Sequence, residues 1–210
     1  TKRLESAFLD PNIGGSDLLH ERHLYASAGV EQRFTRQLYF DLTGFYRNFY
    51  DRLYAVTDFD LRRTQLKANQ SIYSSDGTGF ATGAEALLRY DLDKRFYGWI
   101  SYQFTYARLQ DGPQGQARRS DEDQAHKLAL VFGAKMTPRL SLDSRWRYQS
   151  GRSYDDIPER TFDSDRAQDS FGPSRLNSAQ FSDFHELDLR LSYRFDLQKW
   201  TILTYLQVNN

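Results

Sequence analysis

The stretch His185-Glu-Leu-Asp-Leu-Arg-Leu-Ser-Tyr-Arg-Phe195 decides the fold class, because its side chains alternate strictly in polarity. Successive side chains of an extended strand point to opposite faces. The histidine, leucines, tyrosine and phenylalanine therefore share one face, and the charged residues and the serine share the other. This period of two predicts a β-strand that is apolar on one side and charged on the other.

The same alternation recurs along the chain, about eight times in all. Residues 140–149 repeat it clearly, with Trp146 and Tyr148 on the face opposite Arg145 and Arg147. The remaining strands are expected at 23–34, 37–50, 79–91, 95–108, 124–136 and 200–209. Each spans about 10 to 14 residues, which exceeds a typical globular strand and is enough for a tilted strand to cross a bilayer.

The lengths of the connections carry a second signal. Short polar turns are expected near 35–36, 91–94, 137–139 and 196–199, and long polar surface loops at 51–78, 109–123 and 150–181. Outer-membrane barrels alternate short periplasmic turns with long extracellular loops in this way. The sequence therefore predicts an all-β fold, in which residues 1–210 form one portion of an antiparallel up-and-down transmembrane β-barrel with about eight long strands.

Composition excludes several other classes of protein. The mean hydropathy of −0.74 is too polar for a bundle of transmembrane helices. The chain has no cysteine, so it has neither disulfides nor a thiolate metal site. Equal numbers of basic and acidic residues, 28 of each, argue against a nucleic-acid partner.

A soluble β-sandwich is the main alternative, because it also has alternating strands. The aromatic content of 15% fits either a buried core or the aromatic girdles of a membrane barrel. Long strands, alternating connection lengths and aromatic residues at strand ends favour the membrane. These aromatic residues are Tyr46, Tyr50, Tyr90, Tyr106, Trp146 and Tyr148.

The expected topology puts both ends of the chain on the extracellular side. Strand 23–34 enters a short periplasmic turn, so it runs downward, and strand 200–209 leaves the last short turn, so it runs upward. Complete bacterial barrels have both ends on the periplasmic side. The chain is therefore expected to be a fragment, with further strands and a plug domain outside it.

An ordered series of short motifs resembles the C-terminal barrel of TonB-dependent receptors. It includes Tyr25-Ala-Ser-Ala-Gly-Val-Glu31, Leu42-Thr-Gly-Phe-Tyr-Arg47, Gly83-Ala-Glu-Ala-Leu-Leu-Arg-Tyr90, Gly98-Trp-Ile-Ser-Tyr102 and Leu206-Gln-Val-Asn209. Asp10-Pro11, Ser16-Asp-Leu18, Glu21, Asp123-Gln-Ala-His-Lys-Leu128 and Ser150-Gly-Arg152 fit the same order. Order and spacing agree with the family over nearly the whole chain.

The resemblance implies a plugged barrel of about 22 strands in a bacterial outer membrane. Its partners would be outer-membrane lipid, the plug domain of the same parent chain and a TonB-type energy-coupling protein. The implied function is active uptake of a scarce ligand such as a siderophore, a corrinoid or a glycan. No cofactor and no catalysis are expected. A passive porin or structural barrel, which would have no plug, is the alternative.

The charged face of the strands is expected to line the lumen, because an ion on the lipid face costs several kcal/mol near the midplane. Mixed signs along this face suggest cross-strand pairs that contact the plug, although simple bracing and solvation of the wall would explain any single residue. The expected lumen-lining residues are Glu31, Arg33, Asp41, Arg47, Glu85, Arg89, Asp143, Arg145, Arg147, Glu186, Asp188, Arg190 and Arg194.

Aromatic and arginine residues on the expected extracellular loops are candidates for ligand contact, with loop solvation as the alternative. They are Tyr54, Phe59, Tyr73, Arg118, Arg119, Tyr154 and Phe171. The acidic loop 150–181 lacks the spacing and central glycine of a calcium loop, and the four histidines are scattered singly, so no metal site is expected. Ser182, Asp183, Asp123 and two nearby histidines, His126 and His185, would suit a rim hydrolase, but no nucleophile motif surrounds them.

Overall fold

A computed structural model describes residues 18–55, 73–93, 95–120, 123–156, 160–163, 168–171 and 175–210, of which 156, 160–163, 168–171 and 175–176 are described by their backbone alone. All of the elements in these ranges are β-strands. None of the described residues forms a helix that is long and apolar enough to cross a membrane.

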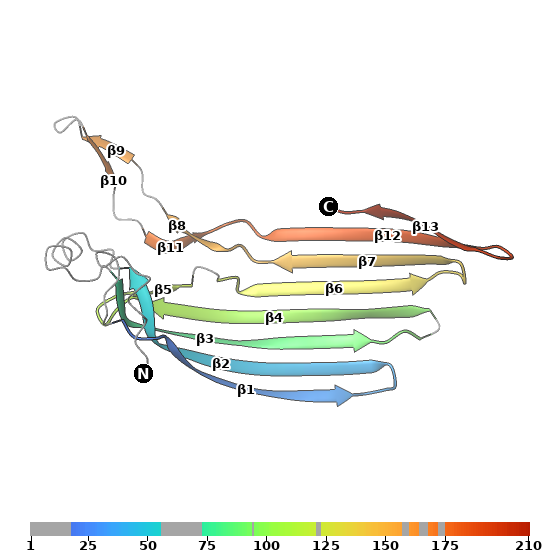
Figure 1. The fold of residues 1–210 in the computed structure, drawn as a ribbon, viewed down its shortest axis with the longest axis horizontal. Helices are drawn as coiled ribbons and strands as arrows, with labels where there is room; N and C mark the ends of the chain where they lie inside the picture. The colour runs from blue at the N-terminus through green and yellow to red at the C-terminus, as the bar shows by residue number, and fades with distance from the viewer. Residues whose placement is uncertain are drawn as a thin grey trace.

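The main sheet is antiparallel and holds all eight of the expected long strands. They pair in the order β1-β2-β3-β4-β6-β7-β12-β13 (Figure 1). Their bounds are β1 Arg22–Arg33, β2 Leu38–Ala55, β3 Tyr73–Tyr90, β4 Phe96–Gln110, β6 His126–Lys135, β7 Leu140–Gln149, β12 Phe184–Asp196 and β13 Thr201–Val208. The all-β, up-and-down prediction is thus confirmed, with each long strand beside its neighbour in sequence.

The short connections gather at one end of the sheet, called here the turn end (Figure 1). Thr35 and Thr137 build two of them in the same way. The Thr35 hydroxyl accepts hydrogen bonds from the backbone N–H groups of Gln37 and Leu38, and the Thr137 hydroxyl accepts from those of Arg139 and Leu140. A hydroxyl that replaces backbone partners in this way stabilises a tight turn, so the polar composition of these segments predicted them correctly.

The opposite end, called the loop end, contains strands that the sequence did not predict. β5 (Ala117–Arg119) pairs with β4, β8 (Ser153–Asp156) pairs with β11 (Arg175–Gln180), and β9 (Arg160–Asp163) pairs with β10 (Gln168–Phe171). β2 and β3 also extend past their expected ends, with register shifts between Phe49 and Tyr54. The long connections expected at 109–123 and 150–181 therefore contain short strands that the sequence did not predict, because backbone pairing with neighbouring segments outweighs their polar composition.

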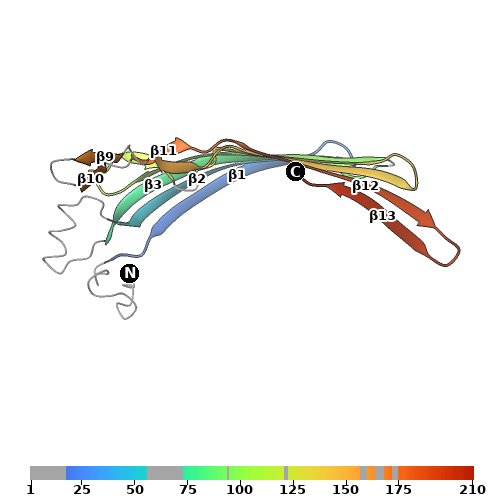
Figure 2. The ribbon, with the colours of Figure 1, turned by 90° about the horizontal axis from the view of Figure 1, so that it is seen from above.

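The main sheet is a single curved layer (Figure 2). β1 and β13 are its two edges and do not pair with each other, so the described residues form an open wall rather than a closed barrel. No second sheet packs face to face against it among the described residues, whereas a soluble β-sandwich would require one.

Burial in this sheet is the reverse of that in a soluble protein. In β12, Leu187, Leu189 and Leu191 are 41–43% exposed. The side chains of Glu186 and Asp188, which alternate with them, are only 16% and 13% exposed. An apolar row that faces outward while charged residues pack together is the pattern of a strand whose outer face meets lipid.

A cation on the apolar face should therefore prevent assembly into a membrane. Leu189→Lys is expected to destabilise the folded full-length protein by about 2–4 kcal/mol, because Leu189 pairs with Ser144 and Val208 in mid-sheet and an ammonium there meets lipid. The folded fraction in outer membranes, read from the unboiled gel band, measures this effect. Arg190→Lys, which keeps a cation on the other face of the same strand, is the control, and equal folded fractions for the two variants would contradict the assignment of faces.

Candidate functional site

Cross-strand register places all thirteen of the expected lumen-lining residues on the same face of the main sheet. Residues directly opposite each other in an antiparallel pair point to the same side. One row illustrates this, because Glu31, Asp41, Leu87, Ser101, Ala129, Arg147 and Glu186 are successive partners from β1 to β12. We call this side of the sheet the charged face and the other side the apolar face.

The six strand-end aromatic residues lie on the apolar face. Register shows this, since Tyr46 is opposite Ala26 and Thr82, and Trp146 is opposite Leu130 and Leu187. Tyr46, Phe80 and Tyr106 follow one another across β2, β3 and β4, with ring centroids 6.4 and 6.0 Å apart. These rings form an aromatic band on the apolar face that runs from the middle of β2 toward the loop end of β4.

The charged face carries a ladder of ion pairs between β7 and β12. Arg147 pairs with Glu186, and Arg145 Nε lies 2.9 Å from Asp188 Oδ2. Arg145 Nη2 also lies 3.8 Å from Glu186 Oε1, so the two pairs form one network. The arginine side chains are 39–49% exposed, so solvent screening limits each pair to about 0.2–1 kcal/mol.

The other side of the charged face holds three carboxylates, Glu31, Asp41 and Glu85, on β1, β2 and β3. Glu31 and Asp41 are direct register partners, an arrangement that destabilises a sheet because like charges repel. The hydroxyls of Tyr39 and Thr43 each donate to Asp41 at 3.4 Å. No arginine or lysine forms an ion pair with these three carboxylates within the described part of the chain.

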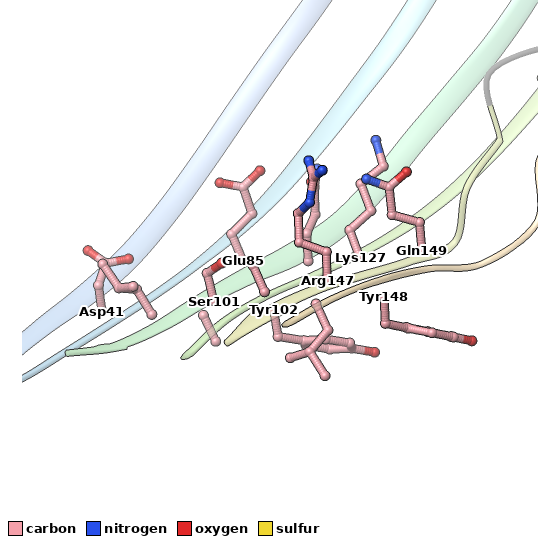
Figure 3. Close-up of a pocket in the computed structure, with 13 residues that line it drawn as sticks. Asp41, Glu85, Ser101, Tyr102, Lys127, Arg147, Tyr148 and Gln149 are labelled. Carbon is pink, nitrogen blue, oxygen red and sulfur yellow. The ribbon is translucent and has the colours of Figure 1, made fainter. Parts of the chain in front are cut away.

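A hollow of about 540 Å³ lies over the middle of the charged face (Figure 3). Short side chains, Ser101 on β4 and Ala129 on β6, form its floor. Glu85 stands at one side, and Lys127 and Arg147 stand at the other. A second hollow of about 390 Å³ continues toward the loop end and shares Glu85 and Lys127 with the first.

Tyr97 bridges from β4 to β7 across a glycine. Its hydroxyl donates to Asp143 Oδ1 at 2.7 Å. Gly133 of β6 lies between them, and a Cβ at that position would be 2.1 Å from a carbon of the Tyr97 ring. The glycine is therefore required where the ring crosses, and the bridge fixes Asp143, one of the expected lumen-lining residues.

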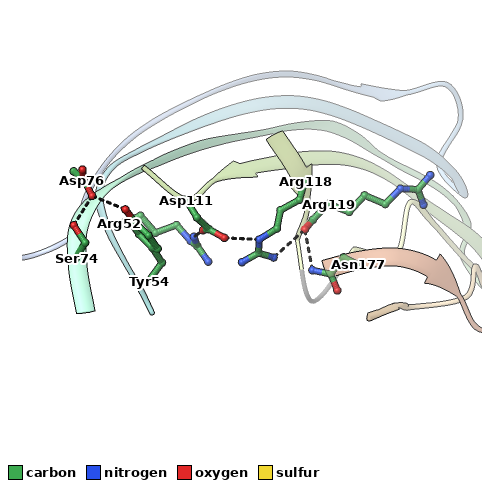
Figure 4. Close-up of polar contacts among 8 residues, drawn as sticks. All are labelled: Arg52, Tyr54, Ser74, Asp76, Asp111, Arg118, Arg119 and Asn177. Atoms are coloured by element: carbon green, nitrogen blue, oxygen red, sulfur yellow. Dashed lines mark hydrogen bonds and ion pairs between the residues drawn. The ribbon is translucent and has the colours of Figure 1, made fainter. Parts of the chain in front are cut away.

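Polar contacts join several segments at the loop end (Figure 4). The Asp111 carboxylate accepts from Arg52 Nη1 at 2.6 Å and from Arg118 Nε at 2.7 Å. The backbone carbonyl of Arg119 accepts from the side-chain amide of Asn177 at 3.0 Å. These contacts connect β2, the β4–β5 hairpin and β11.

Five of the seven loop candidates for ligand contact lie at this end, but not as one cluster. Tyr54 donates to Asp76 at 3.0 Å, Tyr73 begins β3, and Tyr154 packs against Phe181 with ring centroids 4.5 Å apart. Arg118 and Arg119 lie on opposite faces of β5, since Leu109 and Arg108 are their respective partners. Phe59 and the side chain of Phe171 lie outside the described residues.

Two aspartates near the loop end have shifted pKa values. Burial raises the pKa of Asp123, and Arg119 and Arg108 oppose this shift only partly. The Tyr148 hydroxyl and the Gly151 N–H, at 2.8 and 3.1 Å, lower the pKa of Asp183. Sequence reasoning noted both residues for their nearness to histidines, but the described part of the chain brings no three His, Asp or Glu side chains together as a metal site.

Comparison with known proteins identifies a family that matches this chain. The family model described as "TonB dependent receptor-like, beta-barrel" matches residues 8–210. No curated protein sequence matches the chain.

Three solved structures share the fold. A structure of the FpvAI–pyocin S2 complex has 15% identity and a TM-score of 0.60, with 90% of this chain and 23% of that chain covered. The outer membrane transporter YddB from Escherichia coli has 13% identity and a TM-score of 0.58, with 93% and 29% covered. The FrpB iron transporter from Neisseria meningitidis (F3-3 variant) has 11% identity and a TM-score of 0.57, with 86% and 25% covered. The chain thus spans about a quarter of the length of these proteins.

Gly133→Ala should break the Tyr97 bridge. The added methyl group displaces the Tyr97 ring and separates its hydroxyl from Asp143, so we expect the folded full-length protein to lose about 1–3 kcal/mol. Tyr97→Phe removes only the hydrogen bond and should cost about 1 kcal/mol. The temperature at which the folded gel band disappears ranks the two variants, and a Gly133→Ala band as heat-resistant as wild type would rule out the crossing.

Asp111→Asn should loosen the loop end, because Arg52 and Arg118 lose the carboxylate that they share. Cleavage of 111–125 by an added protease in intact cells is expected to speed up several-fold, in line with the loss of charge-assisted hydrogen bonds. The control is Asp196→Asn, which removes the ion pair with Arg194 at 3.1 Å at the turn end. Unchanged cleavage in Asp111→Asn would show that the contacts at Asp111 do not hold this segment.

Proposed function

Because the chain belongs to the TonB-dependent receptor β-barrel family, we propose that it forms part of the wall of an outer-membrane receptor that takes up a scarce ligand. The family match over residues 8–210 is the observation that carries the proposal. In the intact protein, a plug domain would fill the lumen and an inner-membrane TonB-type protein would supply energy.

The outward-facing leucines support a membrane location for this wall. Rows such as Leu187, Leu189 and Leu191 present an apolar band, and the aromatic rings beside the loop end match the girdles of transmembrane barrels. In water the same face would favour aggregation, as would the open edges of β1 and β13.

The charged face supports a lumen that contacts a plug. Glu31, Asp41 and Glu85 form no ion pair with the described residues, and a plug segment with arginine or lysine would provide partners for them. Lys127 and Arg147 stand on the opposite side of the hollow, where an acidic plug residue would fit. The hollow over Ser101 and Ala129 leaves space for such side chains.

The loop end is the proposed entry side for ligand. Tyr54, Tyr73 and Tyr154 lie there, and aromatic side chains on loops are common ligand contacts. A siderophore, a corrinoid and a glycan all remain candidate ligands.

The parent protein tests this proposal directly. In outer membranes, an antibody against residues 150–181 should detect a heat-modifiable band far larger than the 24.6 kDa of this chain. Growth on the scarce ligand should require both this protein and the energy-coupling protein, with a passive porin substrate as the control for general permeability. A band near 24.6 kDa would indicate a complete small barrel, and detection only in the soluble fraction would disprove a membrane role.

A further inference from the structure

Two arginines lie side by side on the apolar face, in the row of the aromatic band that is nearer the loop end, where Arg108 is the register partner of Phe80. Arg108 of β4 and Arg119 of β5 are direct register partners. The Arg108 guanidinium carbon lies 4.2 Å from the centroid of the Tyr106 ring, which belongs to the band. Like charges directly opposite each other destabilise a sheet, so this pair calls for an anion.

Among the described residues, Asp123 is the carboxylate that pairs with both arginines. Asp123 Oδ2 lies 4.0 Å from Arg108 Nη1 and 4.0 Å from Arg119 Nε, which is too long for a hydrogen bond. Its side chain is 5% exposed, and this single carboxylate balances at most one of the two guanidinium charges. Arg108 Nη1 donates to the carbonyl of Ala107 at 2.8 Å, and no hydrogen bond from the Arg119 guanidinium is found within the described ranges.

Both guanidinium groups remain accessible from outside. The Arg108 side chain is 25% exposed and the Arg119 side chain is 39% exposed. Aromatic belts of membrane proteins lie at the level of the lipid headgroups. A cation pair in the loop-side row of the band therefore lies at the depth of headgroup phosphates in the outer leaflet.

We propose that Arg108 and Arg119 bind the phosphate group of an outer-leaflet lipid. Guanidinium groups match phosphate oxygens with two parallel hydrogen bonds, and two adjacent arginines can both donate to one phosphate group. A lipid suits this site better than a soluble anion, because its acyl chains would cover the exposed apolar face below the headgroup. The site rests on the proposed membrane location, and it would fix the β4–β5 hairpin against the membrane surface.

Native mass spectrometry of the full-length receptor in detergent micelles tests this site. The added probe is lipid A with both phosphates, and dephosphorylated lipid A and inorganic phosphate are the comparison ligands. Wild type should bind the phosphorylated form at least about tenfold more tightly than the other two, because charge-assisted hydrogen bonds to the phosphate are lost without it.

The double variant Arg108→Gln/Arg119→Gln should lose this preference, and Arg108→Lys/Arg119→Lys should keep part of it, since lysine retains charge but not the planar fork. Arg119→Gln alone covers the case in which the double variant does not fold, and it should weaken binding several-fold. The matched control is Arg139→Gln, an arginine at the turn end that is 56% exposed and lies 3.8 Å from Asp196.

Unchanged lipid binding in the glutamine variants would overturn the proposal, and so would binding of inorganic phosphate as tight as that of lipid A. The result of this binding experiment does not depend on whether the receptor takes up a ligand. Micelle binding reports on the arginine pair even if the receptor needs no energy-coupling protein, and loss of uptake with intact lipid binding would refute only the uptake function.

Discussion

The backbone hydrogen-bond ladder is the constraint on which the rest of this structure depends. Residues that face each other across antiparallel strands point to the same side, so the face of one residue fixes the faces of its whole row. The row from Glu31 through Asp41 and Leu87 to Arg147 and Glu186 crosses seven strands. A slip of one residue in any of these strands would turn its charges toward the apolar side, at a cost of about 2–4 kcal/mol for each basic residue in lipid.

Side-chain size along the rows then shapes the charged face. In the row of Asp41 the middle positions are Ser101 and Ala129, and longer charged residues stand at both ends. In the next row toward the loop end, Gln103 of β4 lies between the acid Glu85 of β3 and the base Lys127 of β6. Register and side-chain length together therefore produce the hollow. Register places short side chains in the middle of the charged face, and it places the acids and the bases on opposite sides of them.

The period of two was enough to predict the long strands and the face of every expected lumen-lining residue, and polar composition predicted the short turns. It was not enough to predict ion-pair partners, since Arg147 and Glu186 lie 39 positions apart in sequence and meet only through the register of β7 with β12. The same applies to the Tyr97 bridge, where Gly133 gave no local signal of a ring above it. The short strands at the loop end were missed because three to six residues carry too little alternation, and tertiary contacts such as that between Asn177 and the Arg119 carbonyl stabilise them.

The same alternation places the adjacent residues Arg118 and Arg119 on opposite faces of the sheet, although both are arginines. Arg118 shares a face with Leu109 and binds Asp111 on the charged side, whereas Arg119 shares a face with Arg108 on the apolar side. Arg118 thus belongs to the contacts that join β2 to the β4–β5 hairpin, and Arg119 faces the surroundings of the barrel. The three-residue strand β5 thus carries Arg118, which binds Asp111 on the charged face, and Arg119, which lies beside Arg108 on the apolar face. Phosphate binding at Arg108 and Arg119 would therefore stabilise the same β4–β5 hairpin that Asp111 stabilises from the other face.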